Sequence, residues 1–421
     1  MGRLWRATGA MIVVFVPKFV QWGRSRLEKR ECDIAIVGAG PAGSTAAYAA
    51  AKAGASVLMI DRRREIGVPV QCGEALAEDV LNELKIKPDE SWAVNKTNAV
   101  KIVSPGGIEV KISEKAGGKV GYILNRKIFD KFLALRAVEA GAELIVGTYV
   151  NQPIIEDGKI VGVRGSGLGG SIEVRCKVLI AADGVGSRVA RWAGIKSVIT
   201  AADIDTCAQF QMKGVKLEST RVLEFYLGSK IAPGGYAWVF PKGEDYANVG
   251  IGILASRAEK TPLEYLQDFV RRMPNLVRGK IIEINAGGVP VCGPLKQTVK
   301  SNVMVVGDAA RQVNPLTGGG IDSAMRAGSI AGEVAAKAVK EGEISEKRLM
   351  EYDKRWKASF GERLQKYLKA KEIFLSLSDE ELDKLAAAVS KIEFDRISLT
   401  DLIRAVMRAD PKLLLKLRGL F

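Results

Sequence analysis

Apolar and polar positions alternate along the chain with two different periods, which predicts a mixed α/β protein. The clearest stretch runs from Asp33 to Asp61, where a short apolar run precedes an Ala-rich segment of helical length. A second apolar run, Val57–Ile60, completes a pattern that is typical of a βαβ unit. Another apolar run at 303–306 leads into a helical pattern at 321–341, which predicts that the chain later returns to the same parallel sheet.

The segment between these two parts of the sheet carries mostly strand patterns. Residues 200–290 alternate strand-like runs with turns around one helical stretch, which predicts an inserted antiparallel β-sheet unit. Helices are also expected at 75–84, at 125–140 and from Ser345 onward. The predicted fold class is α/β, or α+β overall, with a Rossmann-type unit and a C-terminal helical region. The expected parts are an N-terminal extension (1–31), a discontinuous nucleotide-binding domain (32–90, 120–194 and 296–341), a substrate-binding domain (91–119 and 195–295) and a helical domain (342–421).

Glycines at the first turn of the βαβ unit indicate a dinucleotide site. Gly38, Gly40 and Gly43 have GxGxxG spacing, so we expect a tight turn, a close backbone approach to a pyrophosphate and close helix packing, respectively. The helix N-terminus favours the same pyrophosphate. Asp61, at the end of the second strand, is placed to accept a hydrogen bond from a ribose hydroxyl. A second GxGxxG match at 165–170 precedes a strand pattern, and we interpret it as a hairpin turn.

Composition narrows the possible functions. Hydrophobic residues make up 47% and charged residues 26%, which indicates a globular protein. The net charge of +15 suits a membrane surface or acidic partners, and without a basic block with interleaved aromatic residues we expect no nucleic acid. The chain has no histidine, so proton transfer must use other groups. The five cysteines are scattered, which predicts no metal site and favours a reducing compartment.

Both ends of the chain leave more than one interpretation open. The apolar segment 11–20 is interrupted by Pro17 and Lys18 and is too short to span a bilayer. Residues 1–31 are a disordered extension, a consequence of a start codon placed too far upstream, or a membrane-surface anchor. The segment 411–421 mixes leucines with lysine and arginine, which fits either a packed terminal helix or a helix on a membrane surface.

Two further segments are expected to meet the same ligand as the glycine fingerprint. Asp183 follows a buried strand pattern, and Asp308 follows another. Asp308 is suited to bind a ribityl or ribose hydroxyl. The glycines 318–320 allow the backbone to approach a flat ring, and the helix that begins at Ile321 directs its positive end toward that ring. A reduced flavin carries negative charge at its pyrimidine edge, so these residues favour FAD over NAD.

At these motifs the chain resembles a known flavoprotein family. GAGPAG, ADG and GDAA…P…GGGI are similar to the group that includes aromatic-ring hydroxylases. The loop REIGVPVQCGE at 64–74 and the segment PGGYAWVFP at 233–241 are similar to the geranylgeranyl reductases, and most of all to archaeal enzymes of digeranylgeranylglycerophospholipids. The resemblance covers about residues 32–415. It implies FAD-dependent saturation of isoprenoid C=C bonds in membrane lipids.

The resemblance also implies a set of cofactor contacts. Ala75 stands where the family commonly has glycine, a change that we expect to be tolerated. We add Ala42 and Arg62, which adjoin the fingerprint residues, and Asp183. The expected FAD contacts are then Gly38, Gly40, Ala42, Gly43, Asp61, Arg62, Cys72, Gly73, Ala75, Arg126, Val150, Asp183, Asp308, Gly319, Gly320 and Ile321.

Candidate substrate and catalytic residues lie in the two family segments. Tyr236, Trp238 and Phe240 share one face of a strand, either as core or as an apolar wall for an isoprenoid chain. Lys242 is either a contact for a lipid phosphate or a solvated surface lysine. Cys72 follows three arginines that would lower its thiol pKa, and its alternative role is that of a buried structural thiol. Cys72, Tyr236 and ordered water are the open choices of proton donor.

These observations predict an FAD-dependent reductase of geranylgeranyl phospholipid precursors, peripheral at the inner, cytoplasmic face of the cell membrane. The first alternative is a flavin monooxygenase of the same superfamily, and the second is a flavin-containing lipid-binding or electron-carrier protein without bond chemistry of its own. No second nucleotide fingerprint is evident, so reduced ferredoxin, NADPH and a deazaflavin are all open as the external electron donor.

Overall fold

The nucleotide-binding unit is built on an eight-stranded sheet. The computed structural model describes residues 27–113 and 121–390. Five neighbouring strands of the sheet, in the order β18-β11-β1-β2-β8, are parallel, and the long strand β11 also pairs antiparallel with β10. The strands are β1 (Glu28–Val37), β2 (Val57–Ile60), β8 (Glu143–Ile145), β9 (Thr148–Glu156), β10 (Lys159–Gly167), β11 (Gly170–Ala181), β17 (Val299–Lys300) and β18 (Val303–Val305).

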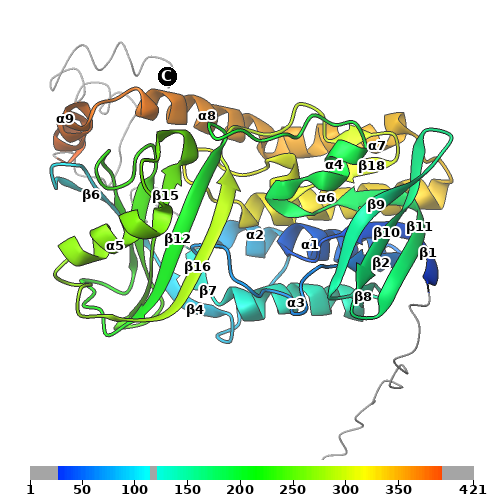
Figure 1. Cartoon of the computed structure of the whole chain (residues 1–421), viewed down its shortest axis with the longest axis horizontal. Coiled ribbons are helices and arrows are strands. Elements are labelled where there is room, and N and C mark those ends of the chain that lie inside the picture. Colours follow the sequence, from blue (N-terminus) through cyan, green and yellow to red (C-terminus); the bar gives the residue numbers. More distant parts are fainter. Residues whose placement is uncertain (1–26, 114–120, 391–421) are drawn as a thin grey trace, which may run out of the picture.

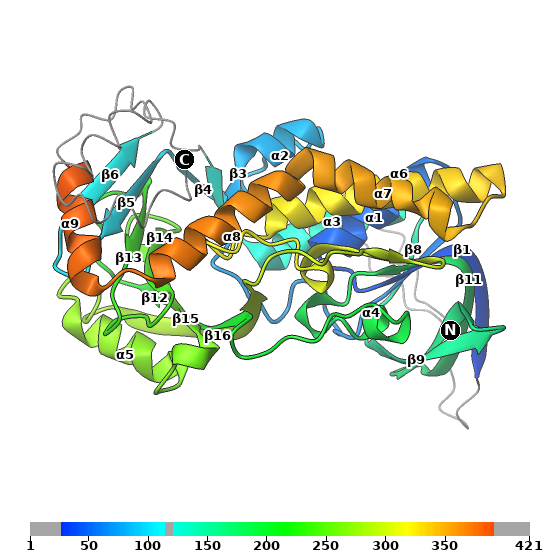
Figure 2. The ribbon, with the colours of Figure 1, turned by 90° about the horizontal axis from the view of Figure 1, so that it is seen from above.

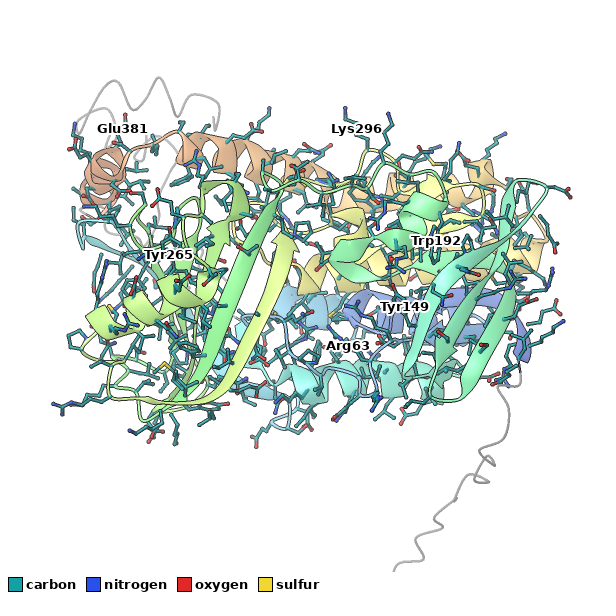
Figure 3. The ribbon with its side chains drawn as sticks, viewed as in Figure 1. Arg63, Tyr149, Trp192, Tyr265, Lys296 and Glu381 are labelled. Atoms are coloured by element: carbon teal, nitrogen blue, oxygen red, sulfur yellow. The ribbon has the colours of Figure 1, made fainter. Side chains whose placement is uncertain are left out.

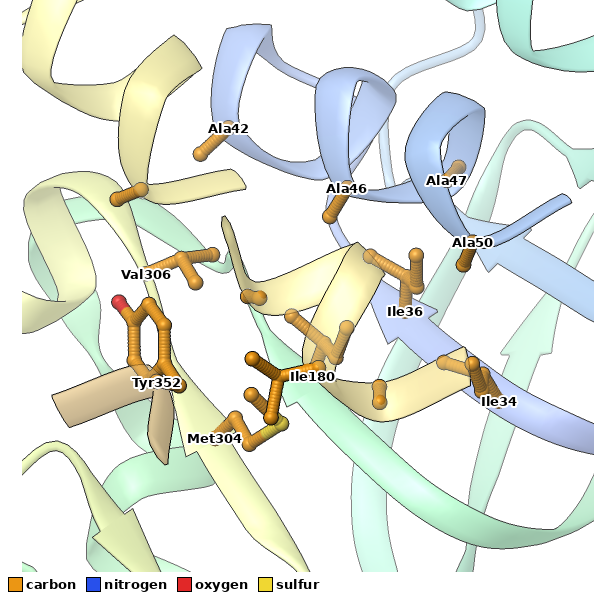
Figure 4. Close-up of a cluster of buried hydrophobic side chains, with 14 of the residues drawn as sticks. Ile34, Ile36, Ala42, Ala46, Ala47, Ala50, Ile180, Met304, Val306 and Tyr352 are labelled. Atoms are coloured by element: carbon orange, nitrogen blue, oxygen red, sulfur yellow. The ribbon is translucent and has the colours of Figure 1, made fainter. Parts of the chain in front are cut away.

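Helices cover one face of the five parallel strands, and the β9–β10 hairpin folds over their other face (Figure 1). Figure 4 shows the alanines of α1 against isoleucines of β1 and β11. Glycines of α6 allow this helix to approach α1 closely, because a Cβ at Gly328 or Gly332 would lie 2.2 Å from a backbone oxygen of α1. The helices of this face are α1 (Pro41–Lys52), α3 (Arg126–Glu139), α6 (Ile321–Glu341) and α7 (Glu346–Trp356), and α4 (Arg188–Trp192) lies on the other face.

The inserted unit is a seven-stranded sheet in the order β16-β12-β15-β14-β13-β5-β6. Helix α5 (Pro262–Arg272) covers one of its faces and begins at a capping box formed by Thr261 and Glu264. The opposite face is turned toward the nucleotide-binding unit. Its strands are β5 (Ala99–Val103), β6 (Glu109–Ser113), β12 (Ile204–Lys213), β13 (Val222–Tyr226), β14 (Tyr236–Pro241), β15 (Tyr246–Leu254) and β16 (Lys280–Pro290).

A three-stranded sheet and the C-terminal helices connect the two units. Figures 1 and 2 show α7 to α9 running from the parallel sheet to the outer edge of the seven-stranded sheet. Asp383 of α9 accepts hydrogen bonds from Ser104 Oγ at 2.6 Å and from Gly106 N at 2.7 Å, which fixes α9 to the β5–β6 turn. The elements are β3 (Ala75–Ala77), β4 (Ala93–Thr97), β7 (Gly121–Leu124), α2 (Glu78–Glu83), a π-helical turn (Lys357–Gly361), α8 (Glu362–Leu375) and α9 (Asp379–Val389).

The mixed α/β class, the Rossmann-like unit and the hairpin at 165–170 are confirmed. Two expectations were wrong in detail. The helix expected at 75–84 begins only at Glu78, because residues 75–77 pair with β7 as a strand. The inserted sheet is not purely antiparallel, since β5 and β13 come from distant segments and pair in parallel. Residues 28–31, expected in the N-terminal extension 1–31, form the start of β1. The interpretations of 1–26 and 411–421 lie outside the described residues, among which no helix is long and apolar enough to cross a membrane.

Candidate active site

A cavity of about 830 Å³ lies where the parallel sheet faces the seven-stranded sheet. The three segments expected to meet there do so, since Gly38, Asp183 and Asp308 all line it. Arg63 and Tyr149, labelled in Figure 3, line its nucleotide end. Of the expected site residues, all line the cavity except Gly43 and Lys242. The cavity therefore joins the glycine fingerprint to the aromatic strand β14 in one space.

The fingerprint glycines have the steric properties that a phosphate cradle needs. Gly38 has φ +101°, and a Cβ there would lie 2.2 Å from the Ala182 carbonyl oxygen. A Cβ at Gly43 would lie 1.8 Å from the Gly38 oxygen, so only glycine lets α1 pack here. A Cβ at Gly40 would meet nothing within 4 Å, which leaves the N-terminus of α1 open toward the cavity. An anionic group fits at this open N-terminus.

The carboxylate of Asp61 is buried beside this turn. One oxygen accepts a hydrogen bond from Ala39 N at 2.8 Å, and the other accepts one from Arg63 N at 2.8 Å. Each carboxylate oxygen has a second acceptor site, and Asp61 lines the cavity. Asp61 thus fixes the fingerprint turn and still has room to accept a ribose hydroxyl.

The opposite end of the cavity is formed by Asp308 and the N-terminus of α6. Burial raises the pKa of Asp308, while the nearby Arg126 guanidinium opposes that shift. A Cβ at Gly320 would lie 3.1 Å from a Val313 methyl and 3.4 Å from Asp308 Oδ1. Glycine therefore keeps this edge narrow, and the peptide groups at the start of α6 remain accessible to a flat ring.

A buried hydrogen-bond network holds the loop that carries Cys72. Glu74, at φ 72°, accepts hydrogen bonds from Arg126 N at 2.8 Å and from Asn248 Nδ2 at 2.7 Å. Its carboxylate also pairs with Lys242 Nζ at 2.5 Å. Gln209 Nε2 donates to the Cys72 carbonyl at 3.0 Å. These bonds attach the loop to the cavity-facing side of the seven-stranded sheet and to the start of α3.

The structure corrects two expectations about this loop. The Cys72 thiol has a raised pKa, because burial outweighs the effect of Arg126, so the expected lowering by the three preceding arginines was wrong. Lys242 is buried and paired with Glu74, and it does not line the cavity. Neither of its expected roles, a lipid phosphate contact or a solvated surface lysine, fits this position. All five cysteines are free thiols.

The aromatic side chains of β14 form one wall of the cavity, on the face predicted from their spacing. Trp238 donates to Gln209 Oε1 at 3.1 Å and packs over Gly250, where a Cβ would lie 2.1 Å from its ring. Tyr236 donates its hydroxyl hydrogen to the Thr317 carbonyl, and burial raises its pKa. The wall is thus mainly apolar, and the Tyr236 hydroxyl lies at the edge that faces glycines 318–320.

Sequence reasoning missed three groups of residues. Glu74 was quoted as part of a motif and given no role. Gln209 and its neighbour Gln211 alternate with apolar residues in β12, and this period-two signal was available in the sequence. Helix α8 adds Arg363, Leu364 and Tyr367 to the cavity lining, and no sequence signal links that distant helix to the site.

Comparisons with known proteins agree with this geometry. A model of the geranylgeranyl reductase catalytic domain matches residues 203–289, and a model of the NAD(P)-binding Rossmann-like domain matches residues 36–82. A solved structure of a geranylgeranyl bacteriochlorophyll reductase-like protein from Thermoplasma acidophilum has a TM-score of 0.86 at 39% identity. The similarity covers 93% of this chain and 100% of that one.

Curated relatives of similar length also match this chain over nearly its whole length. Digeranylgeranylglycerophospholipid reductase 1 of Methanococcoides burtonii is 49% identical over 93% of this chain and 96% of its own length. Digeranylgeranylglycerophospholipid reductase 1 of Methanothermobacter thermautotrophicus is 45% identical over 93% of this chain and 98% of its own. With identity at this level over nearly the whole length of both relatives, the chain belongs to the digeranylgeranylglycerophospholipid reductase family.

Proposed function

We propose that this protein is an FAD-dependent reductase that saturates C=C bonds in the geranylgeranyl chains of archaeal membrane glycerophospholipid precursors. The observation that carries the proposal is the single cavity that joins a dinucleotide fingerprint to an aromatic wall. The names of the curated relatives support the lipid substrate, and the reductase domain match covers the strands that form that wall.

Residues of this chain account for binding of the cofactor. The open backbone at Gly40 and the N-terminus of α1 suit the pyrophosphate, and Asp61 suits the ribose of an adenosine. Asp308 and the start of α6 suit the ribityl chain and the ring. This two-ended site favours FAD over a shorter flavin. When bound and reduced, FAD supplies a hydride.

The protein's own contribution to the reaction is mainly positioning. An isolated alkene has no polar group to hold, so its orientation depends on apolar contacts. Trp238 and Phe240 supply those contacts, and Trp238 is fixed by Gln209. The Cys72–Glu74 loop closes the same region, because a Cβ at Gly73 would lie 3.1 Å from the Phe240 ring. The loop therefore packs against the wall beside the space where the ring is proposed to lie.

We further propose that the protein works at the inner face of the cell membrane, where its substrate lies. Edge strand β16 exposes 60% of Ile282 and 59% of Ile284, while residues 285–289 of the same strand line the cavity. Arg278 and Lys280 are exposed beside these isoleucines and suit anionic headgroups. The electron donor is an external reductant, for which reduced ferredoxin, NADPH and a deazaflavin are alternatives.

Mass spectrometry of a geranylgeranyl phospholipid incubated with dithionite-reduced protein tests the proposal. We expect the lipid to gain two hydrogens for each double bond reduced, and acid-released cofactor to have the mass of FAD. Incorporation of oxygen during aerobic oxidation of NADPH would instead support a monooxygenase. If the mass of the lipid does not change, the result would instead support a flavin-containing electron carrier or lipid-binding protein.

A further inference from the structure

One carboxyl group in the cavity has no place in the roles described so far. Asp205 of β12 lines the cavity, and its Oδ1 is buried without a hydrogen-bond partner among the described residues. Lys371 of α8 is the nearest cation, with its Nζ 4.0 Å from that oxygen. Lys371 is itself buried and donates a hydrogen bond to the Val291 carbonyl at 3.1 Å. A buried, incompletely paired carboxyl in an apolar cavity calls for a functional explanation.

Strand register places Asp205 beside the reacting region. Cys207 and Tyr236 both lie opposite Gly252, on either side of β15, so their side chains share one face. Asp205 is two residues before Cys207 and therefore belongs to that face. Gly252, which lies between Cys207 and Tyr236 in the sheet, has no side chain, and a Cβ there would lie 3.3 Å from Cys207 Sγ, so the thiol lies over this glycine beside Asp205.

Glycines 318–320 bound the part of the cavity beside Asp205 and Tyr236 from the opposite side. A Cβ at Gly318 would lie 3.6 Å from a methyl of Val289 and 4.0 Å from the Tyr236 hydroxyl. Val289 is the register partner of Asp205 on β16. Asp205 thus borders the same cavity as the aromatic wall, Cys207, Val289 and the backbone proposed to meet the ring.

We propose that Asp205 supplies the proton that completes alkene reduction. This inference rests on the proposed function. The hydride from reduced FAD forms a C–H bond at one alkene carbon. The O–H bond of Asp205 breaks, and its proton forms the second C–H bond at the other carbon. The two electrons of the hydride thereby saturate the alkene. The carboxylate left on Asp205 faces the Lys371 ammonium and regains its proton from solvent after the product leaves.

Acidity favours Asp205 over the other candidate donors. Burial raises the pKa of Asp205 to about 6, with Lys371 opposing the shift. Burial raises the pKa of Cys207 to about 12 and also raises the pKa values of Tyr236 and Cys72. Asp205 is therefore by far the strongest acid among these groups, and it still holds a proton in part of the molecules near neutral pH. An apolar chain in the cavity would raise its pKa further by removing water.

Charge variants with a matched control test the inference. Asp205→Asn should lower the rate of lipid reduction about 100-fold or more, the usual effect of losing a general acid, while FAD binding is retained. The control is Asp203→Asn, because Asp203 accepts hydrogen bonds from Thr200 and does not line the cavity. We expect that variant to stay within about two-fold of the unchanged protein, as is usual for a group outside the reaction.

The pH profile separates proton supply from a purely structural ion pair. The rate should fall as pH rises through the pKa of Asp205, because only the protonated form donates. Lys371→Met removes the cation that lowers this pKa, so the falling limb should move to higher pH. If the pair only anchors α8 to the sheet, both variants lose stability and the limb stays in place, which overturns the inference.

Infrared spectroscopy gives a readout that does not depend on turnover. In the unchanged holoprotein a protonated-carboxyl band should titrate near pH 6 and be absent from Asp205→Asn. Absence of such a band, or full lipid reduction by Asp205→Asn, would refute the role of Asp205. If the unchanged protein binds FAD and shows the band but reduces no geranylgeranyl lipid, the proposed function fails while the protonated cavity carboxyl stands.

Discussion

The buried pair of Glu74 and Lys242 allows a direct test of how the Cys72 loop is held. Their side chains are only 1% and 5% exposed, and their charged atoms lie 2.5 Å apart. Lys242→Met would leave the Glu74 carboxylate buried with hydrogen bonds from Arg126 N, Asn248 and, at 3.5 Å, Gln211. Removing one partner of such a pair typically destabilises a protein by about 3–5 kcal/mol.

The control is a pair with the same 2.5 Å contact on the surface. Lys213 and Asp245 are 59% and 46% exposed. Lys213→Met should lower the free energy of unfolding by no more than about 1 kcal/mol, because solvent screens exposed pairs. Urea unfolding of both variants, followed by tryptophan fluorescence, measures the difference. The double variant Glu74→Gln with Lys242→Met should regain part of the loss, since no unpaired charge is left buried.

The same experiment decides between two roles for Lys242. If its ammonium binds a lipid phosphate, Lys242→Met will raise the KM for the phospholipid and leave unfolding unchanged. If Lys242 pairs with Glu74, as in the structure, Lys242→Met will lower the free energy of unfolding. Loss of this pair will also release the Cys72 loop and so weaken flavin binding. A loss of stability below about 1 kcal/mol, which is the range of an exposed pair, would refute the structural reasoning.

Other predictions concern the fingerprint, the aromatic wall and the edge strand. Gly43→Ala should abolish flavin binding, measured by absorbance, because its Cβ would lie 1.8 Å from the Gly38 oxygen. The control is Gly169→Ala, which should retain flavin binding because a Cβ there would meet nothing within 4 Å. Tyr236→Phe should keep lipid reduction within about ten-fold if its role is positional; a loss approaching that of a missing general acid would contradict this. Ile282→Ser with Ile284→Ser should weaken sedimentation with anionic vesicles, while Ile155→Ser, equally exposed on β9, should not.

The local pattern of apolar and polar residues was sufficient to predict those helices and strands that have one clear hydrophobic period. The βαβ unit around Gly38 was predictable because residues 34–37 of β1 and all of β2 are buried and its helix is defined by glycine spacing. Residues 75–77 were misread because their pairing with β7 depends on a segment 46 residues away, which local periodicity does not contain. The parallel pairing of β5 with β13 was unpredictable for the same reason.

The site shows where sequence reasoning fails for a chemical reason. From its neighbours in sequence, Lys242 was interpreted as an ammonium that is free for a lipid phosphate or for solvent. Cys72 was interpreted either as a thiol activated by arginines or as a buried structural thiol. The structure contradicts both interpretations of Lys242, which has the buried partner Glu74, and the activated-thiol interpretation of Cys72, because burial raises the pKa of its thiol. The charge state of a group depends on what packs around it in three dimensions. A polar residue that recurs at every second position of an apolar strand, as Gln209 and Gln211 do after Asp205 and Cys207 in β12, reports on that environment better than its sequence neighbours do.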